Sequence, residues 1–397
     1  MPWIRSRAVW LAEGRFDAVA VRVRGDRIVD VATSIPHGAS VIDVSDCYLL
    51  PGLIDAHVHL YARLPREAPG RVGDDRADRG ADEVAGTGRS ATARREAARR
   101  AGLMLEAGVT TVRDVGSSPE FLEIRAAWNR RRGSAPWILA SGPPVTEPDG
   151  HGAAIGRPAR GVAAVVAAVE ELAVMGADLI KVMATAGGGE GGLPAFSEEE
   201  LRALVEAAHT RGLKVAAHAH SGEGIRRCVA AGVDSIEHAS FKEGDRHFFD
   251  EAVARQLSAS RTPVVLTPVG YRKAELAGRL ERMRELERQW RQLYELGVPI
   301  AIGTDVGVPE MDYGTSTPYA LMVLARAGIP PAAVLQAAGP VTAGVLGLGD
   351  EVGSVAPGRR ADLIAVPRDP TGDMAALFEV NWVMSRGLVV RARSRAS

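Results

Sequence analysis

Hydrophobic and polar residues alternate along short segments at both ends of the chain. The segments with this period of two are residues 18–23, 27–31, 362–366, 382–384 and 387–390. Such alternation is typical of short strands with one buried face. We therefore predict one small β-sandwich domain that combines residues 1–49 with residues 357–397.

The middle of the chain follows a different order, in which a helix-forming stretch ends at a glycine and a short apolar strand follows. The first unit is a helix at 91–107, Gly108, and a strand at 109–114. Further helices are predicted at 162–175, 197–211, 222–231 and 273–295, and further strands at 178–182, 214–218, 235–238 and 299–305. Ser197 and Glu200 form a capping-box pattern at the start of one helix. The repeated units predict parallel strands with helical crossovers, hence an α/β fold with a (β/α)8 barrel over residues 50–356.

Composition limits the classes of partner. The chain has 397 residues and a formal net charge of −1, so no global electrostatic attraction to nucleic acid or an anionic membrane is expected. Cys47 and Cys228 lie far apart, which argues against a disulfide framework or a thiolate zinc site. Residues 1–13 lack signal-peptide features and no apolar run reaches about 18 residues. We expect a cytoplasmic enzyme with a small-molecule substrate and the option of homo-oligomerisation.

Potential metal ligands stand at the ends of the predicted strands. They are His57, His59, Lys181, His218, His238 and Asp305. The carboxyl ends of parallel barrel strands meet on one face, so these side chains are expected to converge. The His57–His59 pair alone is weak, because core or surface histidines give the same spacing. Ligand types at four further strand ends favour a metal site.

Lys181 ends an apolar strand, where an unpaired ammonium group is costly. A buried lysine loses its proton readily, and the neutral amine can then add carbon dioxide to form a carbamate that bridges two cations. The alternative is an ion pair with Glu190 or Asp305. The spacing leaves both interpretations open.

Several segments together resemble the amidohydrolase superfamily, in order and over nearly the whole chain. They are residues 51–59 (Pro-Gly-Leu-Ile-Asp-Ala-His-Val-His), 180–182, 217–220, 235–238, 303–305 and the tail at 353–363. The nearest likeness is to the group that holds Xaa-Pro dipeptidases, related carboxypeptidases and imidazolonepropionase. Lys181 points to the binuclear dipeptidase-like members, because the imidazolonepropionase-type members are mononuclear and do not use this lysine.

The resemblance implies a ligand set and a mechanism. His57, His59 and Asp305 would hold the more buried metal, His218 and His238 would hold the second, and carboxylated Lys181 would bridge them. Two zinc ions are expected, because nitrogen and oxygen ligands in an open site suit zinc. A bridging hydroxide would be the nucleophile, and Asp305 would carry its proton to the leaving nitrogen.

Substrate contacts are less clearly marked. The resemblance places His151, in a Gly-His-Gly loop, near the substrate's carbonyl or carboxylate, and Tyr271 could donate to a developing oxyanion. The alternatives are a histidine that orders the loop and a packed aromatic ring. Arg113 and Asp114 are expected to form a structural ion pair, and His220 to line the wall of the site without ligating.

Two segments are expected to shape specificity: 61–89, which is long enough to form a lid, and 309–314. The leading hypothesis is hydrolysis of an amide bond, either peptide-like or cyclic. The alternatives are a mononuclear deaminase or cyclic-amidine hydrolase in which Lys181 forms only an ion pair, and an ester or carbamate hydrolase. A non-catalytic tetrameric scaffold on this fold is disfavoured, because all six ligand positions are filled.

Overall fold

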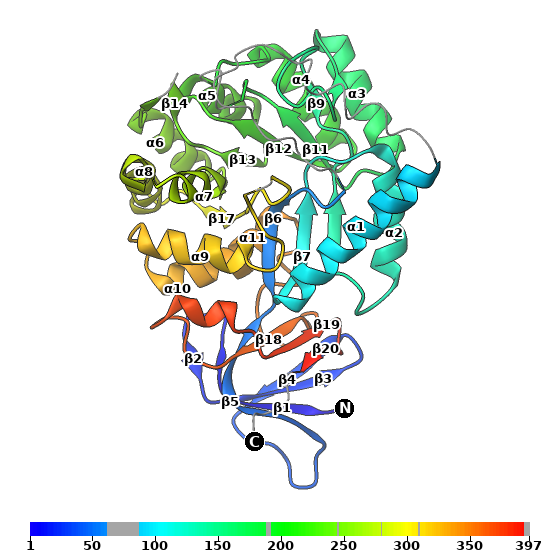
Figure 1. Cartoon of the computed structure of the whole chain (residues 1–397), viewed down its shortest axis with the longest axis vertical. Helices are drawn as coiled ribbons and strands as arrows, with labels where there is room; N and C mark the ends of the chain where they lie inside the picture. The colour runs from blue at the N-terminus through cyan, green and yellow to red at the C-terminus, as the bar shows by residue number, and fades with distance from the viewer. Residues whose placement is uncertain (62–86, 188–191, 244–245, 279, 309, 393–397) are drawn as a thin grey trace.

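The computed structural model describes residues 1–61, 87–187, 192–243, 246–278, 280–308 and 310–392. Nearly all of the predicted lid segment 61–89, together with Glu190, lies outside these residues. Figure 1 shows two regions: a sheet built from the blue and red ends of the chain, and a larger region in which helices surround short strands.

The sheet joins the two ends of the chain through strand β5. Its order is β20-β19-β18-β5-β1-β3-β4, and β2 pairs with β1. The strands are β1 (Trp3–Trp10), β2 (Phe16–Asp17), β3 (Ala20–Arg24), β4 (Arg27–Ala32), β5 (Val41–Pro51), β18 (Leu363–Val366), β19 (Trp382–Ser385) and β20 (Leu388–Ala392). Strand β5 runs parallel to β1 and antiparallel to β18, so residues more than 300 positions apart share one sheet. Apolar residues from both ends, including Ile4, Val21 and Leu363, form a core cluster of their own.

The larger region contains two runs of parallel strands. One is β6 (Leu53–Val58), β7 (Val109–Asp114) and β8 (Trp137–Ala140). The other has the order β10-β9-β11-β12-β13-β16-β17, with β9 (Val145–Thr146), β10 (Arg157–Pro158), β11 (Leu179–Met183), β12 (Lys214–Ala219), β13 (Ser235–His238), β16 (Val264–Leu266) and β17 (Ile300–Ile302). Backbone hydrogen bonds connect the two runs on both sides: Asp178 N donates to Ala140 O (2.9 Å), and Asp305 N donates to His57 O (2.8 Å).

Helices alternate with these strands and also follow β17. They are α1 (Thr87–Glu106), α2 (Pro119–Arg130), α3 (Val162–Val174), α4 (Glu198–Thr210), α5 (Gly222–Ala231), α6 (Glu251–Ser260), α7 (Val269–Leu276), α8 (Arg284–Glu295), α9 (Ser316–Arg326), α10 (Pro331–Gln336) and α11 (Thr342–Val345). Helix α4 buries Leu201, Leu204, Val205 and Ala208, which is the spacing of one helical face. The predicted capping box at its start is confirmed, with both the Ser197 and the Glu200 hydrogen bonds present.

The single long helix predicted over 273–295 is wrong. Helix α7 ends at Leu276, a short 3-10 turn covers Leu280–Met283, and α8 begins at Arg284. Gly278 lies between them with a φ of +65°, a left-handed conformation that an α-helix cannot contain. The residues on both sides of Gly278 have a helix-forming composition, so the sequence pattern did not indicate the break.

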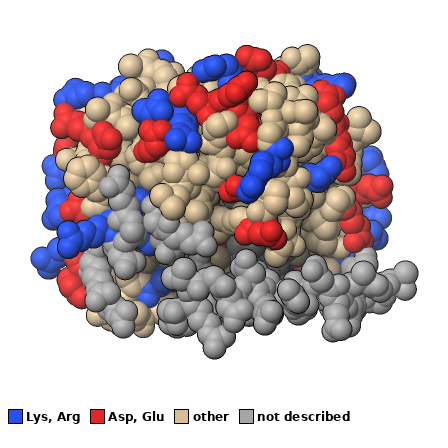
Figure 2. Space-filling view, turned by 90° about the horizontal axis from the view of Figure 1, so that it is seen from above, with Lys and Arg blue, Asp and Glu red and all other residues tan. Residues whose placement is uncertain are grey.

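None of the helices in the described ranges is long and apolar enough to cross a membrane. Figure 2 shows acidic and basic side chains interspersed over one face of the molecule, with neither sign gathered into a large patch among the described residues.

Candidate metal centre

Two buried histidines lie at the end of strand β6: His57 is within the strand and His59 follows it by one residue. His57 and His59 are 2% and 3% exposed. The carboxylate of Asp55 holds this strand in place, because it accepts hydrogen bonds from His57 N (3.2 Å), Thr304 N (3.1 Å) and Thr317 Oγ1 (2.9 Å). Burial raises the pKa of Asp55 to about 6, against the opposing effect of these bonds. Asp55 thereby ties β6 to the chain that follows β17.

Asp305 is turned toward these histidines by its backbone. Its φ of +57° is uncommon for a residue with a side chain and is typical of functional sites. Oδ1 of Asp305 lies 3.4 Å from His57 Nε2 and 3.2 Å from His59 Nε2. Burial raises the pKa of this carboxyl, but the hydrogen bonds of His57 and His59 and the charges of His57 and His238 outweigh burial and hold it well below the usual range. Two imidazole nitrogens and a carboxylate oxygen therefore face one point, which we call the first position.

Two glycines make room for these histidines. A Cβ at Gly303 would lie 2.6 Å from His57 Cβ, and a Cβ at Gly307 would lie 2.6 Å from His59 Cβ. Neither distance is possible for real side chains, so the chain after β17 can approach β6 only with glycine at both places.

A second group of imidazoles lies beside the first. The ligand atoms of His218, His220 and His238 are all within 4.8 Å of one another, and those of His57, His238 and Asp305 are equally close. His238 ends β13 with a φ of +71°, and its Nδ1 is 2.7 Å from Thr267 Oγ1. Burial and the neighbouring charges hold the pKa of both His218 and His238 well below 6.5, which keeps them in the neutral form that binds metals. We call the place between His218 and His238 the second position.

Lys181 extends from β11 into the same interior and is 1% exposed. Within the described residues its Nζ has no hydrogen-bond partner, and the same holds for Nε2 of buried His218. The ion pair with Asp305 considered above does not form, and Glu190 lies outside the described residues. Burial lowers the pKa of Lys181 to about 8, with the charge of Arg113 acting in the same direction. Such orphaned buried atoms beside a His/Asp group fit a bound metal, so the residues present suit metal binding.

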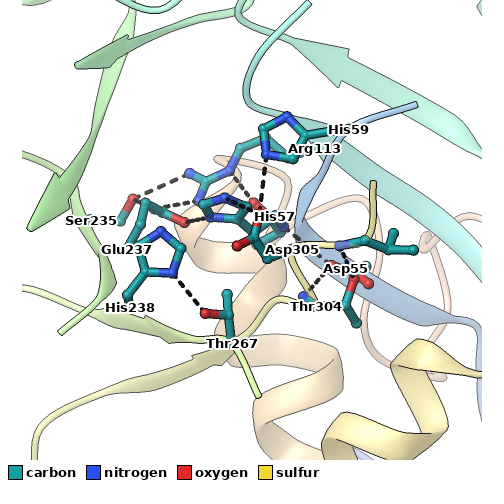
Figure 3. Close-up of polar contacts among 12 residues, drawn as sticks. Asp55, His57, His59, Arg113, Ser235, Glu237, His238, Thr267, Thr304 and Asp305 are labelled. Carbon is teal, nitrogen blue, oxygen red and sulfur yellow. Dashed lines mark hydrogen bonds and ion pairs between the residues drawn. The ribbon is translucent and has the colours of Figure 1, made fainter. Parts of the chain in front are cut away.

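Arg113 does not pair with Asp114, which corrects the expected ion pair. Its Nη2 donates to Glu237 Oε1 at 2.7 Å, while Asp114 accepts from the backbone nitrogens of Leu60 (2.7 Å) and Gly116 (3.3 Å). Figure 3 shows Glu237 between Arg113 and His57, whose Nδ1 is 2.7 Å from Glu237 Oε2. Burial raises the pKa of Glu237, but Arg113 and His57 outweigh burial and lower it overall. The sequence analysis missed Glu237, although a glutamate in a buried strand was a signal of pairing.

The remaining candidate residues lie at different distances from this centre. The ring of His151 is 4.8 Å from that of His218, and the ring of His220 is 4.5 Å from it, so both border the second position. Burial lowers the pKa of His220 to about 3, with the charge of His151 in the same direction. Tyr271 is buried, its ring centre is 6.4 Å from that of Trp290 on α8, and burial together with Glu287 raises its pKa to about 12. Its role toward an oxyanion stays a prediction.

Comparison with known proteins places this centre in a family. A sequence profile described as "Amidohydrolase family" matches residues 48–390. The ochratoxinase of Aspergillus niger is 26% identical over 374 residues, covering 83% of this chain and 72% of the relative. An imidazolonepropionase of Deinococcus deserti is 28% identical over 184 residues, covering 46% of this chain and 42% of the relative.

A solved structure agrees with the sequence relatives. The crystal structure of a Xaa-Pro dipeptidase with bound methionine in its active site superposes with a TM-score of 0.82 and 28% identity, covering 98% of this chain and 100% of that chain. The profile spans most of the chain and includes every candidate ligand. The chain therefore belongs to the amidohydrolase family and is a hydrolase of carbon–nitrogen bonds.

Proposed function

We propose that this enzyme hydrolyses a peptide-like or cyclic amide with two divalent metal ions, most simply zinc. The supporting observation is the closeness of His57, His59, His218, His238 and Asp305 in two adjacent groups, together with a buried Lys181 Nζ that has no hydrogen-bond partner among the described residues. His57, His59 and Asp305 would hold one ion, and His218 and His238 the other. Lys181, as a carbamate derived from carbon dioxide, would bridge the two.

The bound ions would supply a hydroxide nucleophile near neutral pH and would polarise the substrate carbonyl. Asp305 would accept the proton of the attacking water and deliver it to the leaving nitrogen, since its carboxylate faces the centre and remains ionised. His151 borders the second position and would contact the substrate's carbonyl or carboxylate. Tyr271 would donate its hydroxyl to a developing oxyanion.

The relatives suggest where to begin with substrates. An Xaa-Pro dipeptidase and an ochratoxinase are among the similar proteins, which favours amides of an amino acid as the first class to test. The imidazolonepropionase match favours cyclic amides as the substrate class. It also supports the alternative function of a mononuclear deaminase or cyclic-amidine hydrolase. Esters and carbamates are the remaining alternative, because one ligand set serves several leaving groups.

Metal content separates these mechanisms. The purified chain, stripped with chelator and reloaded with zinc and bicarbonate, should hold about two zinc ions; about one would support the mononuclear alternative. Lys181→Ala should lose the second ion and the activity. Lys214→Ala is the matched control. Lys214 begins β12, so it lies at the strand end opposite to the candidate ligands, and it pairs with Asp234. Retained metal and activity in Lys181→Ala would contradict the bridging carbamate.

The substrate screen uses the zinc-loaded enzyme against N-acyl amino acids, Xaa-Pro dipeptides, lactams and aryl esters. Turnover of the first two classes above the last two would support a peptide-like substrate, whereas turnover of lactams alone would support the cyclic class.

We further propose that the two runs of parallel strands close into a (β/α)8 barrel over residues 50–356. The end sheet would then belong to a β-sandwich domain formed by residues 1–49 and 357–397.

A further inference from the structure

Three of the four candidate ligand histidines, His57, His59 and His238, each have a different acceptor or hydroxyl behind the ring. His57 Nδ1 meets the carboxylate of Glu237 at 2.7 Å, and His238 Nδ1 meets the hydroxyl of Thr267, also at 2.7 Å. His59 Nδ1 lies 3.3 Å from the Gly116 carbonyl. These contacts occupy Nδ1 and leave Nε2 of each ring for a metal ion. Glu237 is the charged acceptor among these three contacts, and the histidine that it contacts, His57, belongs to the first position.

The two kinds of acceptor fix an imidazole to different degrees. An ionised carboxylate only accepts, so it holds the proton of His57 on Nδ1 and leaves a lone pair on Nε2. A hydroxyl both donates and accepts, so Thr267 does not by itself decide which nitrogen of His238 carries the proton. A charged acceptor also makes the ring a stronger electron donor to a metal ion.

Glu237 is itself held rigidly. It is fully buried, and its Oε1 accepts from Arg113 Nη2 at 2.7 Å and from Ser235 Oγ at 2.8 Å. Arg113 is fixed in turn, because its Nε donates to Ala56 O at 2.7 Å. Figure 3 shows the contacts among Ser235, Glu237, Arg113 and His57, which belong to β13, β7 and β6. Glu237 therefore has little freedom to leave His57.

We propose that Glu237, clamped by Arg113, is a positioning residue that makes the first position bind its metal ion more tightly than the second. The inference rests on the proposed function, since it concerns the same two ions. The first ion would enter a site whose ligand nitrogens are set in advance, and the second would be the exchangeable one. The alternative is a purely structural Glu237–Arg113 ion pair that stiffens the interior and has no effect on metal affinity.

The test is a titration of the metal-free full-length chain with Co²⁺, followed by visible absorption and by competition with a chromophoric chelator. The wild-type protein should show a tight and a weak class of site. Glu237→Gln keeps the shape of the side chain but removes its charge. It should weaken the tight class by about 10- to 100-fold, change the absorption of the first equivalent, and leave the weak class within about threefold. Thr267→Val should weaken only the weak class.

Asp234→Asn is the matched control. Asp234 forms another carboxylate–histidine contact, with His209 at 2.8 Å, but it precedes β13 and so lies at the strand end opposite the metal ligands. This variant should leave both dissociation constants unchanged. Unfolding of each metal-free variant in urea measures stability separately from affinity.

The outcomes separate the inference from the function on which it rests. Lower stability of Glu237→Gln with unchanged dissociation constants would identify a structural ion pair and overturn the inference. Equal weakening of both classes would also overturn it, while leaving the two-metal function intact. Failure of the wild-type chain to bind divalent ions would instead remove the proposed function itself.

Discussion

Gly303 lies so close to His57 that a methyl group has no room between them. A Cβ on Gly303 would come 2.6 Å from His57 Cβ and 2.7 Å from Val265 Cγ1. This close approach links the end of β17 to His57, and Asp305 follows Gly303 by two residues. The packing of one glycine therefore decides whether His57 and Asp305 face the same point.

Gly303→Ala should separate β17 from β6 and weaken metal binding at the first position. We expect a loss of about 1–3 kcal/mol in the free energy of unfolding, as for other overpacked sites. Metal analysis should show fewer ions per chain. Gly102→Ala is the control, since Gly102 lies inside α1 and an added Cβ would have no atom of the described residues within 4 Å, so the change should be neutral or stabilising. Unchanged metal content in Gly303→Ala would contradict the expected displacement.

Metal loading of the stripped protein should depend on pH through Lys181. Burial lowers the pKa of this amine to about 8, and only the neutral amine adds carbon dioxide. At constant dissolved carbon dioxide, the neutral fraction rises from about 1% at pH 6 to about half at pH 8. The rate of zinc uptake at the second position should rise roughly 50-fold over that range. Lys181→Ala should show no such rise, and a short carboxylate such as acetate should partly restore its metal content. A pH-independent rate in the wild-type chain would argue against the carbamate.

The buried carboxylate of Asp362 contacts Arg360 and Arg386, whose guanidinium groups reach Thr111 and Asn129 of the larger region. It accepts from Arg360 Nε at 2.7 Å and from Arg386 N at 2.7 Å, and the Arg386 guanidinium in turn donates to Asn129 O at 2.6 Å beside the end of α2. Asp362→Asn leaves a buried arginine without its charge partner and should lower the free energy of unfolding by about 3–5 kcal/mol. Chemical denaturation measures this loss.

An exposed ion pair provides the comparison for Asp362. Glu295 pairs with Arg291 on the surface of α8, where the side chains are 55% and 58% exposed. Glu295→Gln should change stability by less than about 1 kcal/mol. If both substitutions lower the free energy of unfolding by similar amounts, the buried contacts of Asp362 do not stabilise the packing of the end sheet against the larger region.

Removal of the capping box should affect stability alone. Ser197 Oγ accepts from Glu200 N at 3.2 Å at the start of α4, on the outside of the parallel strands. Ser197→Ala should lower the free energy of unfolding by about 1 kcal/mol. Metal content should stay the same, because none of the ligands lies on α4. Loss of metal in this variant would reveal a coupling that the contacts do not show.

Local patterns were enough to predict most elements, because strand and helix periods and glycine stops are properties of neighbouring residues. The strand at 109–114 and the helix at 222–231 match the structure to the residue. The long helix at 273–295 failed, because Gly278 interrupts a composition that is otherwise helical. The spacing of potential ligands at strand ends also predicted that His57, His218, His238 and Asp305 would lie close together, since parallel strands present their carboxyl ends on one face.

The sequence by itself determined which residues could bind metal and that parallel strands would carry them. Only the tertiary structure decided the partners of those residues. Arg113 turned from its chain neighbour to Glu237, 124 positions away, because both are buried and each neutralises the other. Tyr271 packs against α8 because its ring finds apolar contacts there. His238 and Asp305 adopt left-handed backbone conformations. Such conformations persist where the surrounding tertiary structure holds them, so the neighbouring sequence does not predict them.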